Sequence, residues 1–209
     1  VLNYIFKGPV LEWYLRVKMR IEKYYQPYNE LVPREGEILD LGCGYGFMSY
    51  MLSFTAPLRK ITGVDHDAEK IRVAANCISK NENLDFICED ITRYSFGNKD
   101  AILLSDVLHY LPQTSQEELL YRCIEKLNPG GMILVRDADS KEEKRHKRTK
   151  LTEVFSTRIV GFNKTSDASK ELYFTSLENI SRIVDRQGLK MDVIREAKHT
   201  SNFLLIIHK

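Results

Sequence analysis

The sequence predicts an α/β fold in which helices cover both faces of a doubly wound parallel sheet. Short apolar segments alternate with amphipathic, helix-like segments between residues 37 and 135. A glycine-rich stretch at residues 42–46 joins the first expected strand to the first expected helix. The 209 residues, 43% hydrophobic and 29% charged, are sufficient for one folded domain and unlike a disordered chain.

The expected elements follow from hydrophobic periodicity and from the residues that end helices and form turns. Strands are expected at residues 37–41, 60–64, 84–88, 101–104, 132–135, 191–194 and 203–207. Helices are expected at residues 47–54, 67–79, 115–127 and 176–187, and an N-terminal amphipathic helix is expected to end near Pro27. Thr114 is expected to cap the third of these helices, residues 128–131 to form a turn, and Gly188 to end the last helix.

Two segments lie outside the alternation. Residues 1–35 are expected to form an N-terminal helical segment, and residues 36–209 the α/β domain with an insertion at 138–175. The ligand of an open α/β sheet binds at the carboxyl ends of the strands, so functional residues are expected in the loops that follow them.

Composition excludes several classes of protein. Lys and Arg total 31 and Asp and Glu total 29, so the net charge of +2 does not favour nucleic acid as a general partner. The longest apolar run, residues 203–207, is too short to cross a bilayer, and the first residues do not resemble a signal peptide, so a cytoplasmic protein is expected. The four cysteines form no CxxC pair, which indicates reduced thiols and no metal site.

The glycine loop is the most informative feature. It has the pattern D-x-G-x-G-x-G from Asp40 to Gly46, follows an expected strand and begins a helix. Glycines there allow a tight turn and let a ligand approach the backbone closely. Asp65 ends the next expected strand, where a carboxylate can accept hydrogen bonds from both hydroxyls of a ribose.

The details of this loop distinguish two cofactor classes. A dinucleotide fingerprint, G-x-G-x-x-G, requires glycine at position 47, where this chain has Phe47. Asp40 lies two residues before the first glycine, where its carboxylate can hold an amino group but would repel a pyrophosphate. The loop therefore favours a cationic adenosine derivative.

At five places the chain resembles the class I S-adenosylmethionine-dependent methyltransferases. The segments are ILDLGCGYG (38–46), TGVDHD (62–67), ICEDI (87–91), LLSDVLHYLP (103–112) and LNPGGMILV (127–135). The resemblance implies a Rossmann-like seven-stranded sheet, mostly parallel with its last strand antiparallel. It also implies S-adenosylmethionine as cofactor, methyl transfer as activity, and a lid role for residues 1–35.

The resemblance also implies roles for individual residues. Asp40 and Gly42 would lie at the methionine end of the cofactor, and Asp65 would hold the ribose. His66 would lie beside the adenine, Asp90 would accept from its amino group, and Ile91 would pack on the ring. The whole expected cofactor set is Asp40, Gly42, Cys43, Gly44, Gly46, Asp65, His66, Asp90, Ile91, Ser105 and Asp106, the last two bordering the sulfonium. A sheet that has kept the loop but lost the cofactor is the alternative.

A weakly acidic methyl acceptor needs a base, for which three candidates stand out: His109, Asp137 and His146. The alternative for His109 is packing or cofactor contact, and the alternative for His146 is a solvated, charged helix. Asp106 with Asp137 or Asp139 would be the ligands of a divalent ion. No Asp-Asn pair follows the fifth strand, so no metal is expected.

Several acceptor classes are not favoured. Residues 105–108 read SDVL, which lacks the Asp/Asn-Pro-Pro-aromatic motif of amino-methylating nucleic-acid enzymes, and no cysteine follows strands four or five as pyrimidine C5 methylation requires. A small molecule, a lipid or a carrier-bound acyl group remains. The aromatic residues of segment 1–35 suit a planar or apolar acceptor, with core packing as the alternative. The six Lys or Arg residues within 141–150 suit a phosphate, a phosphopantetheine or an acidic carrier protein, with a solvated loop as the alternative.

Residues 3–18, 44–53, 103–112 and 145–165 are also similar to a methyltransferase domain at the end of bacterial lipid acyltransferase-like fusion proteins. Those proteins belong to aryl-polyene and flexirubin-type pigment gene clusters. The similarity implies an aromatic acceptor, free or on an acyl carrier, and a larger fusion polypeptide, with which a first residue of Val1 is consistent. The other readings are a non-catalytic domain that binds the cofactor or a partner, and an RNA methyltransferase that uses the basic insertion.

Overall fold

The computed structural model describes residues 3–4, 11, 13, 16, 25–138, 173–195 and 202–209. Most of the predicted N-terminal segment and nearly all of the predicted insertion at 138–175 lie outside these residues. His146 and Asp139 lie outside them as well. The division into a lid, a domain and an insertion therefore stays a prediction.

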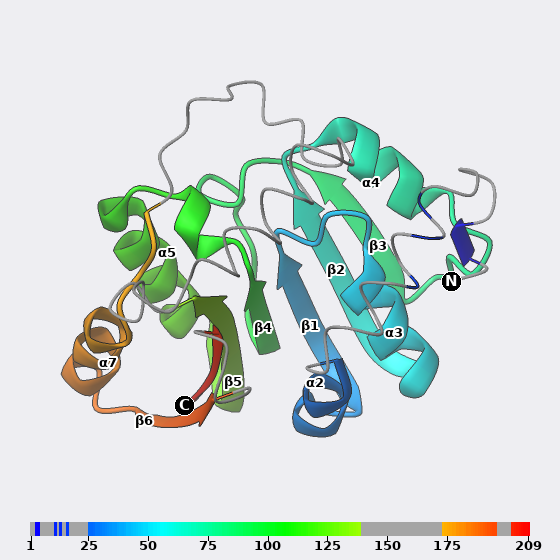
Figure 1. The fold of residues 1–209 in the computed structure, drawn as a ribbon. Coiled ribbons are helices and arrows are strands. Elements are labelled where there is room, and N and C mark those ends of the chain that lie inside the picture. The colour runs from blue at the N-terminus through cyan, green and yellow to red at the C-terminus, as the bar shows by residue number, and fades with distance from the viewer. Residues whose placement is uncertain are drawn as a thin grey trace.

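The sheet has the predicted architecture. Its seven strands have the order β3-β2-β1-β4-β5-β7-β6 (Figure 1). The strands are β1 (Glu35–Leu41), β2 (Leu58–Asp65), β3 (Leu84–Cys88), β4 (Lys99–Ser105), β5 (Leu127–Ala138), β6 (Lys190–Arg195) and β7 (Asn202–His208). Pairs among β1 to β5 are parallel, whereas β7 runs antiparallel between β5 and β6. The predicted antiparallel last strand is confirmed.

Helices cover both faces of the sheet, as the alternating pattern predicts. The α-helices are α2 (Tyr25–Leu31), α3 (Phe47–Thr55), α4 (Ala68–Ala75), α5 (Gln113–Glu125) and α7 (Leu177–Arg186), and a short 3-10 helix, η2, spans Leu108–Tyr110. One apolar core joins α2, α3 and α4 to one face, and a second joins α5 and α7 to the other (Figure 1). None of the helices in the described part of the chain is long and apolar enough to cross a membrane.

Three local predictions are wrong. Pro27 does not end a helix: it lies in the first turn of α2, where its missing N–H has no intrahelical partner to lose. Thr114 does not cap α5, because this helix begins at Gln113, directly after Pro112 and without a side-chain cap. The expected turn at residues 128–131 is instead an irregularity within β5, where the pairing with β4 moves from Leu127 to Met132.

A buried arginine attaches α2 to the sheet. Arg59 of β2 has no exposed surface. Its guanidinium donates hydrogen bonds to the backbone carbonyls of Asn29, Val32, Pro33 and Leu52 and to the side-chain oxygens of Asn29 and Thr55. These acceptors lie at the C-terminal ends of α2 and α3, where helix carbonyls have no intrahelical donor and the helix dipole favours a cation.

Candidate functional site

The glycine loop lies over the end of β2. Its three glycines have positive φ angles, +78° at Gly42, +56° at Gly44 and +74° at Gly46. The backbone N–H groups of Gly42 and Cys43 both donate to the carbonyl of Val64, at 2.8 and 3.1 Å. The loop therefore turns in a left-handed conformation that favours glycine, and it brings its backbone to the carboxyl edge of the sheet.

The three glycines have different surroundings. A Cβ atom at Gly42 would lie 2.6 Å from the Val107 side chain, and one at Gly46 would lie 2.6 Å from Phe86. A Cβ atom at Gly44 would meet no heavy atom within 4 Å in the part of the chain that the structure describes. Gly42 and Gly46 thus allow close internal packing, whereas Gly44 borders space that none of the described residues fills and that a ligand can enter.

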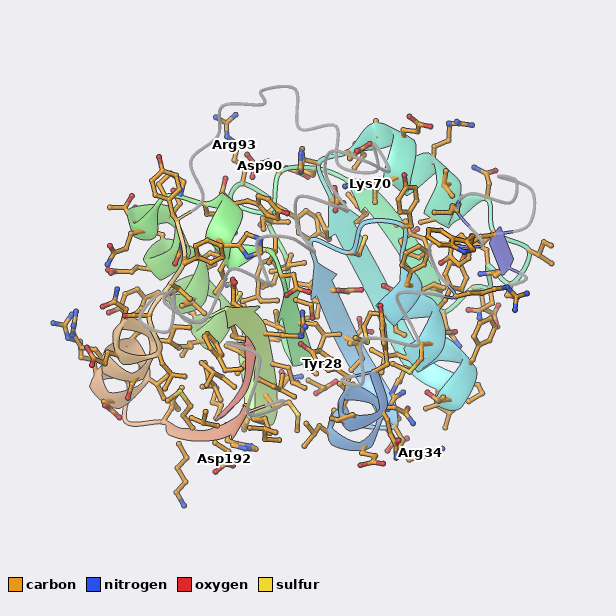
Figure 2. The ribbon with its side chains drawn as sticks, in the orientation of Figure 1. Tyr28, Arg34, Lys70, Asp90, Arg93 and Asp192 are labelled. Atoms are coloured by element: carbon orange, nitrogen blue, oxygen red, sulfur yellow. The ribbon has the colours of Figure 1, made fainter. Side chains whose placement is uncertain are left out.

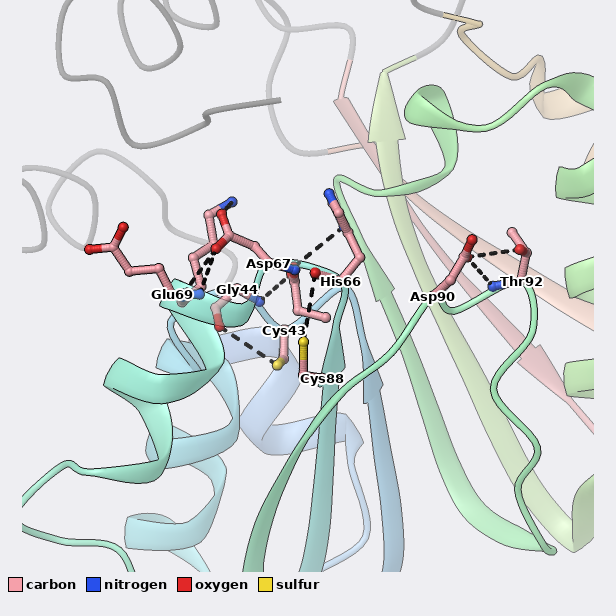
Figure 3. A network of polar contacts seen from close by, with 10 residues as sticks. Cys43, Gly44, His66, Asp67, Glu69, Cys88, Asp90 and Thr92 are labelled. Atoms are coloured by element: carbon pink, nitrogen blue, oxygen red, sulfur yellow. Dashed lines mark hydrogen bonds and ion pairs between the residues drawn. The ribbon is translucent and has the colours of Figure 1, made fainter. Parts of the chain in front are cut away.

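Asp65, at the end of β2, is connected to this loop. One of its carboxylate oxygens accepts from the N–H of Gly44 at 2.8 Å and the other from the N–H of Asp67 at 2.9 Å. A carboxylate has about four lone-pair sites, so each oxygen can still accept a hydrogen bond from a hydroxyl. His66 is mostly exposed beside it, with Nδ1 3.5 Å from a carboxylate oxygen of Asp65. Figure 3 shows Gly44, His66 and Asp90 along the same edge of the sheet.

Asp40 is a buried carboxyl group on β1. It is 2% exposed and accepts a hydrogen bond of 2.6 Å from the Ser49 hydroxyl at the start of α3. Burial raises the pKa of Asp40 to about 6, and the negative charge of Asp65 adds to this increase while the Ser49 bond opposes it. A carboxyl group in this state gains from a cationic partner, because the cation offsets the cost of ionising it.

Asp90 and Ile91 follow β3. One oxygen of Asp90 accepts from both the N–H and the hydroxyl of Thr92, each at 2.8 Å (Figure 3). Burial raises the pKa of Asp90, but the two bonds from Thr92 outweigh it and the pKa lies below its ordinary value. Asp90 is therefore an exposed, ionised acceptor, whereas Ile91 is buried in the core beneath α5.

Ser105 ends β4 on the same edge, and Asp106 follows it. The Ser105 hydroxyl lies 2.8 Å from the hydroxyl of Tyr28 on α2, and Asp106 forms an ion pair with Arg136 of β5. Asp106 is the one non-glycine residue of the described chain with a positive φ, at +54°. Sequence reasoning did not find Arg136 as a site residue, and it considered Tyr28 only as one of the aromatic residues of segment 1–35. The signal for Arg136 was a charge directly after the apolar strand at 132–135.

The structure brings the candidate bases His109 and Asp137 together. The His109 ring Nδ1 lies 2.8 Å from one Asp137 oxygen, and the His109 backbone N–H donates to the other at 3.2 Å. Both side chains are buried, and the imidazole stacks against Phe174. The pair fastens η2 to the end of β5. His146, the third candidate, lies outside the described residues.

The described carboxylates considered as ligands of a divalent ion have other partners. Asp106 pairs with Arg136 and Asp137 with His109, and Asp139 is not described. Nowhere in the described ranges do three or more His, Cys, Asp or Glu side chains gather as a metal site would require.

Tyr4 of the N-terminal segment contacts the glycine loop and the start of α3. The Tyr4 hydroxyl donates to the carbonyl of Tyr45 at 2.9 Å, and its ring packs edge-on against Phe47. Tyr4 and Tyr28 are buried, whereas Trp13 is 53% exposed. For the two tyrosines the core-packing alternative therefore holds. The Tyr4 hydroxyl also supports the glycine loop by binding a backbone carbonyl of that loop.

Comparison with known proteins gives a consistent picture. Residues 38–131 match the model of a family described as a methyltransferase domain. The carboxy-S-adenosyl-L-methionine synthase of Actinobacillus succinogenes is 28% identical over 112 residues, which is 51% of this chain and 46% of that protein. The chain thus spans about half the length of the curated synthases that it matches. A protein of Staphylococcus carnosus, named an uncharacterized methyltransferase, is 26% identical over 84% of this chain and 81% of its own.

Solved structures share the fold. Human N-acetylserotonin methyltransferase, solved with S-adenosylmethionine, superposes with a TM-score of 0.66 at 20% identity, over 96% of this chain and 55% of that one. This degree of likeness establishes a Rossmann-like fold of the kind that methyltransferases have, with the glycine loop and the acid of β2 at the carboxyl edge of the sheet.

Proposed function

We propose that this chain, with its Rossmann-like fold and its match to a methyltransferase domain over residues 38–131, is an S-adenosylmethionine-dependent methyltransferase. The observation that carries the proposal is the open space at Gly44, bordered by the Asp65 carboxylate that binds the Gly44 N–H. The family match and the methyltransferase relatives support both the cofactor and the reaction.

The residues present fit this cofactor. Asp65 would accept from the ribose hydroxyls, because each of its oxygens accepts one backbone N–H and retains a lone pair. Asp90 would accept from the adenine amino group, with His66 and Ile91 near the ring. Asp40, whose pKa is raised to about 6, would gain from the amino group of the methionine moiety. A pyrophosphate at the same place would face the negative charges of Asp40 and Asp65, which argues against a dinucleotide.

The chemistry asks little of the protein beyond placement. S-adenosylmethionine, when bound, supplies a methyl group on a cationic sulfur that leaves as a neutral thioether, so no proton is needed by the leaving group. The contribution of the chain is then to align the acceptor with that methyl group and to exclude water. We place Ser105 and Asp106 next to the sulfur because they lie at and directly after the end of β4, which pairs with β1, the strand that carries Asp40.

His109 and Asp137 connect two segments that border the proposed site. Two hydrogen bonds join them, one through the ring and one through the backbone, so the pair fixes the loop after β4 relative to β5. In this proposal the pair orients that loop and is the candidate base among the described residues. His146 is the other candidate for an acceptor that must lose a proton.

The acceptor that we propose is a small molecule, an aryl compound or a lipid- or carrier-bound group. The likeness to the methyltransferase domain of acyltransferase-like fusion proteins favours an aromatic acceptor. The second candidate is a non-catalytic domain that binds the cofactor or a partner within a larger protein. Calorimetric titration with S-adenosylhomocysteine followed by turnover assays on aryl and lipid acceptors separates the two, because binding without any turnover favours the second.

Replacing Asp65 with alanine tests the ribose contact. The affinity for S-adenosylhomocysteine is expected to fall by roughly 1–3 kcal/mol, because the ribose hydroxyls lose a charged acceptor and the Gly44 N–H loses its partner. Isothermal titration calorimetry measures the change. Asp192→Ala is the matched control, since this aspartate lies exposed on β6 and pairs with His208 at 3.1 Å. An affinity of Asp65→Ala equal to that of the control would remove Asp65 from the site.

The raised pKa of Asp40 predicts a pH dependence of binding. A cationic amino group stabilises the ionised carboxylate, so the affinity for S-adenosylhomocysteine should rise with pH through about 6 and be constant above 7. At pH 5 it is expected to be about tenfold weaker than at pH 7. The folding stability of the unliganded protein depends on pH in the opposite direction. Because the pKa of Asp40 is raised in the folded state, its contribution to stability is fully present below the ordinary pKa of 3.8 and is lost as the pH rises through about 6.

Two controls isolate the contribution of Asp40. Methylthioadenosine lacks the amino group but keeps the adenosine, so it retains the adenosine contacts and loses the contact to Asp40. Its affinity should not follow pH through 6. Asp40→Asn should abolish the pH dependence of S-adenosylhomocysteine binding. The same pH profile for both ligands would contradict the placement of the amino group at Asp40.

A further inference from the structure

Tyr28 joins the N-terminal helix α2 to the candidate site. Its side chain has no exposed surface, and its hydroxyl lies 2.8 Å from the hydroxyl of Ser105. The two residues are 77 positions apart in the sequence. Figure 2 shows Tyr28 where α2 meets the sheet. Because Ser105 is the last residue of β4, this bond connects α2 to the carboxyl edge of the sheet.

The backbone that follows Ser105 is unusual. Asp106 has a φ of +54°, a conformation that L side chains with a Cβ rarely adopt. The N–H of Asp106 donates to the Arg136 carbonyl at 2.9 Å, and its carboxylate pairs with the Arg136 side chain. Ser105 and Arg136 are also register partners between β4 and β5. The Tyr28 bond therefore holds the residue directly before a strained turn.

The phenol of Tyr28 stays protonated in this environment. Burial raises its pKa well above the ordinary value, although the Ser105 bond and the positive charge of Arg136 oppose the rise. Asp106 and Asp40 add to the increase. Tyr28 thus keeps its hydroxyl hydrogen throughout the physiological range and can hydrogen bond to Ser105 as a neutral group.

The position of α2 is itself determined by Arg59. This buried guanidinium donates to the carbonyl of Asn29, the residue directly after Tyr28, and to the carbonyls of Val32 and of Leu52 on α3. Displacing α2 would break these bonds in the protein interior, where each carbonyl would lose its donor. Tyr28 therefore reaches Ser105 from a rigid support and not from a movable segment.

We propose that Tyr28 is a positioning residue, which acts through the Ser105 hydroxyl to hold the Ser105–Asp106 turn in the geometry that binds the cofactor. This inference rests on the proposed function, which places that turn beside the sulfur. Tyr28 has no exposed surface and so acts through Ser105 and not by touching the ligand. In this proposal α2 contributes to cofactor affinity in addition to covering the core.

The test removes the hydroxyl and keeps the ring. Tyr28→Phe is expected to bind S-adenosylhomocysteine about fivefold more weakly in calorimetric titration, which corresponds to about 1 kcal/mol. Tyr50→Phe is the matched control: this buried tyrosine on α3 donates to the Ala74 carbonyl at 2.7 Å, away from Ser105, and its loss should leave the affinity unchanged. Equal affinities for Tyr28→Phe and the wild type would overturn the proposal.

A double variant tests whether Tyr28 acts through Ser105. If it does, Tyr28→Phe combined with Ser105→Ala should bind no more weakly than Ser105→Ala alone. Purely additive losses would mean that Tyr28 affects binding by another route, for example by loosening the whole core, and would overturn the positioning role.

Hydrogen–deuterium exchange gives a readout that needs no ligand. Peptides covering residues 103–110 should exchange faster in Tyr28→Phe than in the wild type, and those of Tyr50→Phe should not. Unchanged exchange would overturn the inference even where affinity falls. A wild-type protein that binds no S-adenosylhomocysteine rejects the proposed function, whereas tight wild-type binding with an unaffected variant rejects the role of Tyr28 alone.

Discussion

Replacing Gly44 with valine is expected to abolish cofactor binding while the protein remains folded. The structure places no heavy atom of its described part within 4 Å of a Cβ at this position, so the added side chain would project into the space that we assign to the ligand. A branched side chain there would also keep the ligand from the loop backbone, whose N–H groups and φ angles favour close approach. Titration with S-adenosylhomocysteine should show no binding up to millimolar ligand.

Backbone strain has to be separated from this steric effect. Gly44 has a φ of +56°, so valine is strained there whatever the free space, by roughly 1–2 kcal/mol. Gly188 provides the match, because its φ is +66°, no heavy atom of the described residues lies within 4 Å of its Cβ position, and it follows α7. Gly188→Val should lose a similar amount of thermal stability and bind normally. Retained binding by Gly44→Val would contradict the location of the site.

The fold could be predicted because its signals are local. Apolar segments such as residues 101–104 and 132–135 are short and bounded by turn residues, and they became the central strands β4 and β5. The glycines at 42–46 signal a loop by residue type alone, and the loop has the positive φ angles that glycine allows. A local signal is less reliable for the exact end of a helix. The predicted Thr114 cap was wrong because a favourable residue type does not determine at which residue the helix begins.

The contacts that organise the site have no local signal. Tyr28 and Ser105 are 77 residues apart, and His109 and Asp137 are 28 residues apart, so no sequence spacing indicates either pair. Asp106 was expected next to the sulfonium, but the sequence contained no sign that Arg136 would pair with it. The neighbours of a strand end are determined by the strand order, and the strand order is a property of the whole sheet.

Arg59 is the residue whose loss is expected to affect stability most. Replacing it with methionine keeps an unbranched side chain of similar length but removes every donor. The acceptors that lose a partner are the carbonyls of Asn29, Val32, Pro33 and Leu52 and the side-chain oxygens of Asn29 and Thr55. A buried acceptor without a donor is unfavourable, and several of them in one place give a loss of roughly 3–5 kcal/mol. Thermal unfolding should show a midpoint lower by about 10 °C.

Two further variants identify the cause of that loss. Arg34→Met removes a neighbouring arginine that is exposed and donates one bond, to the Thr55 carbonyl at 3.0 Å, so it should change stability by less than about 1 kcal/mol. Arg59→Lys retains the positive charge between the ends of α2 and α3 but has three donors in place of five, so it should fall between the wild type and Arg59→Met. If Arg59→Lys were as unstable as Arg59→Met, the number of hydrogen bonds and not the charge would hold α2 in place. If Arg59→Met unfolded like the wild type, neither would hold it, and the rigid support beneath Tyr28 would be absent.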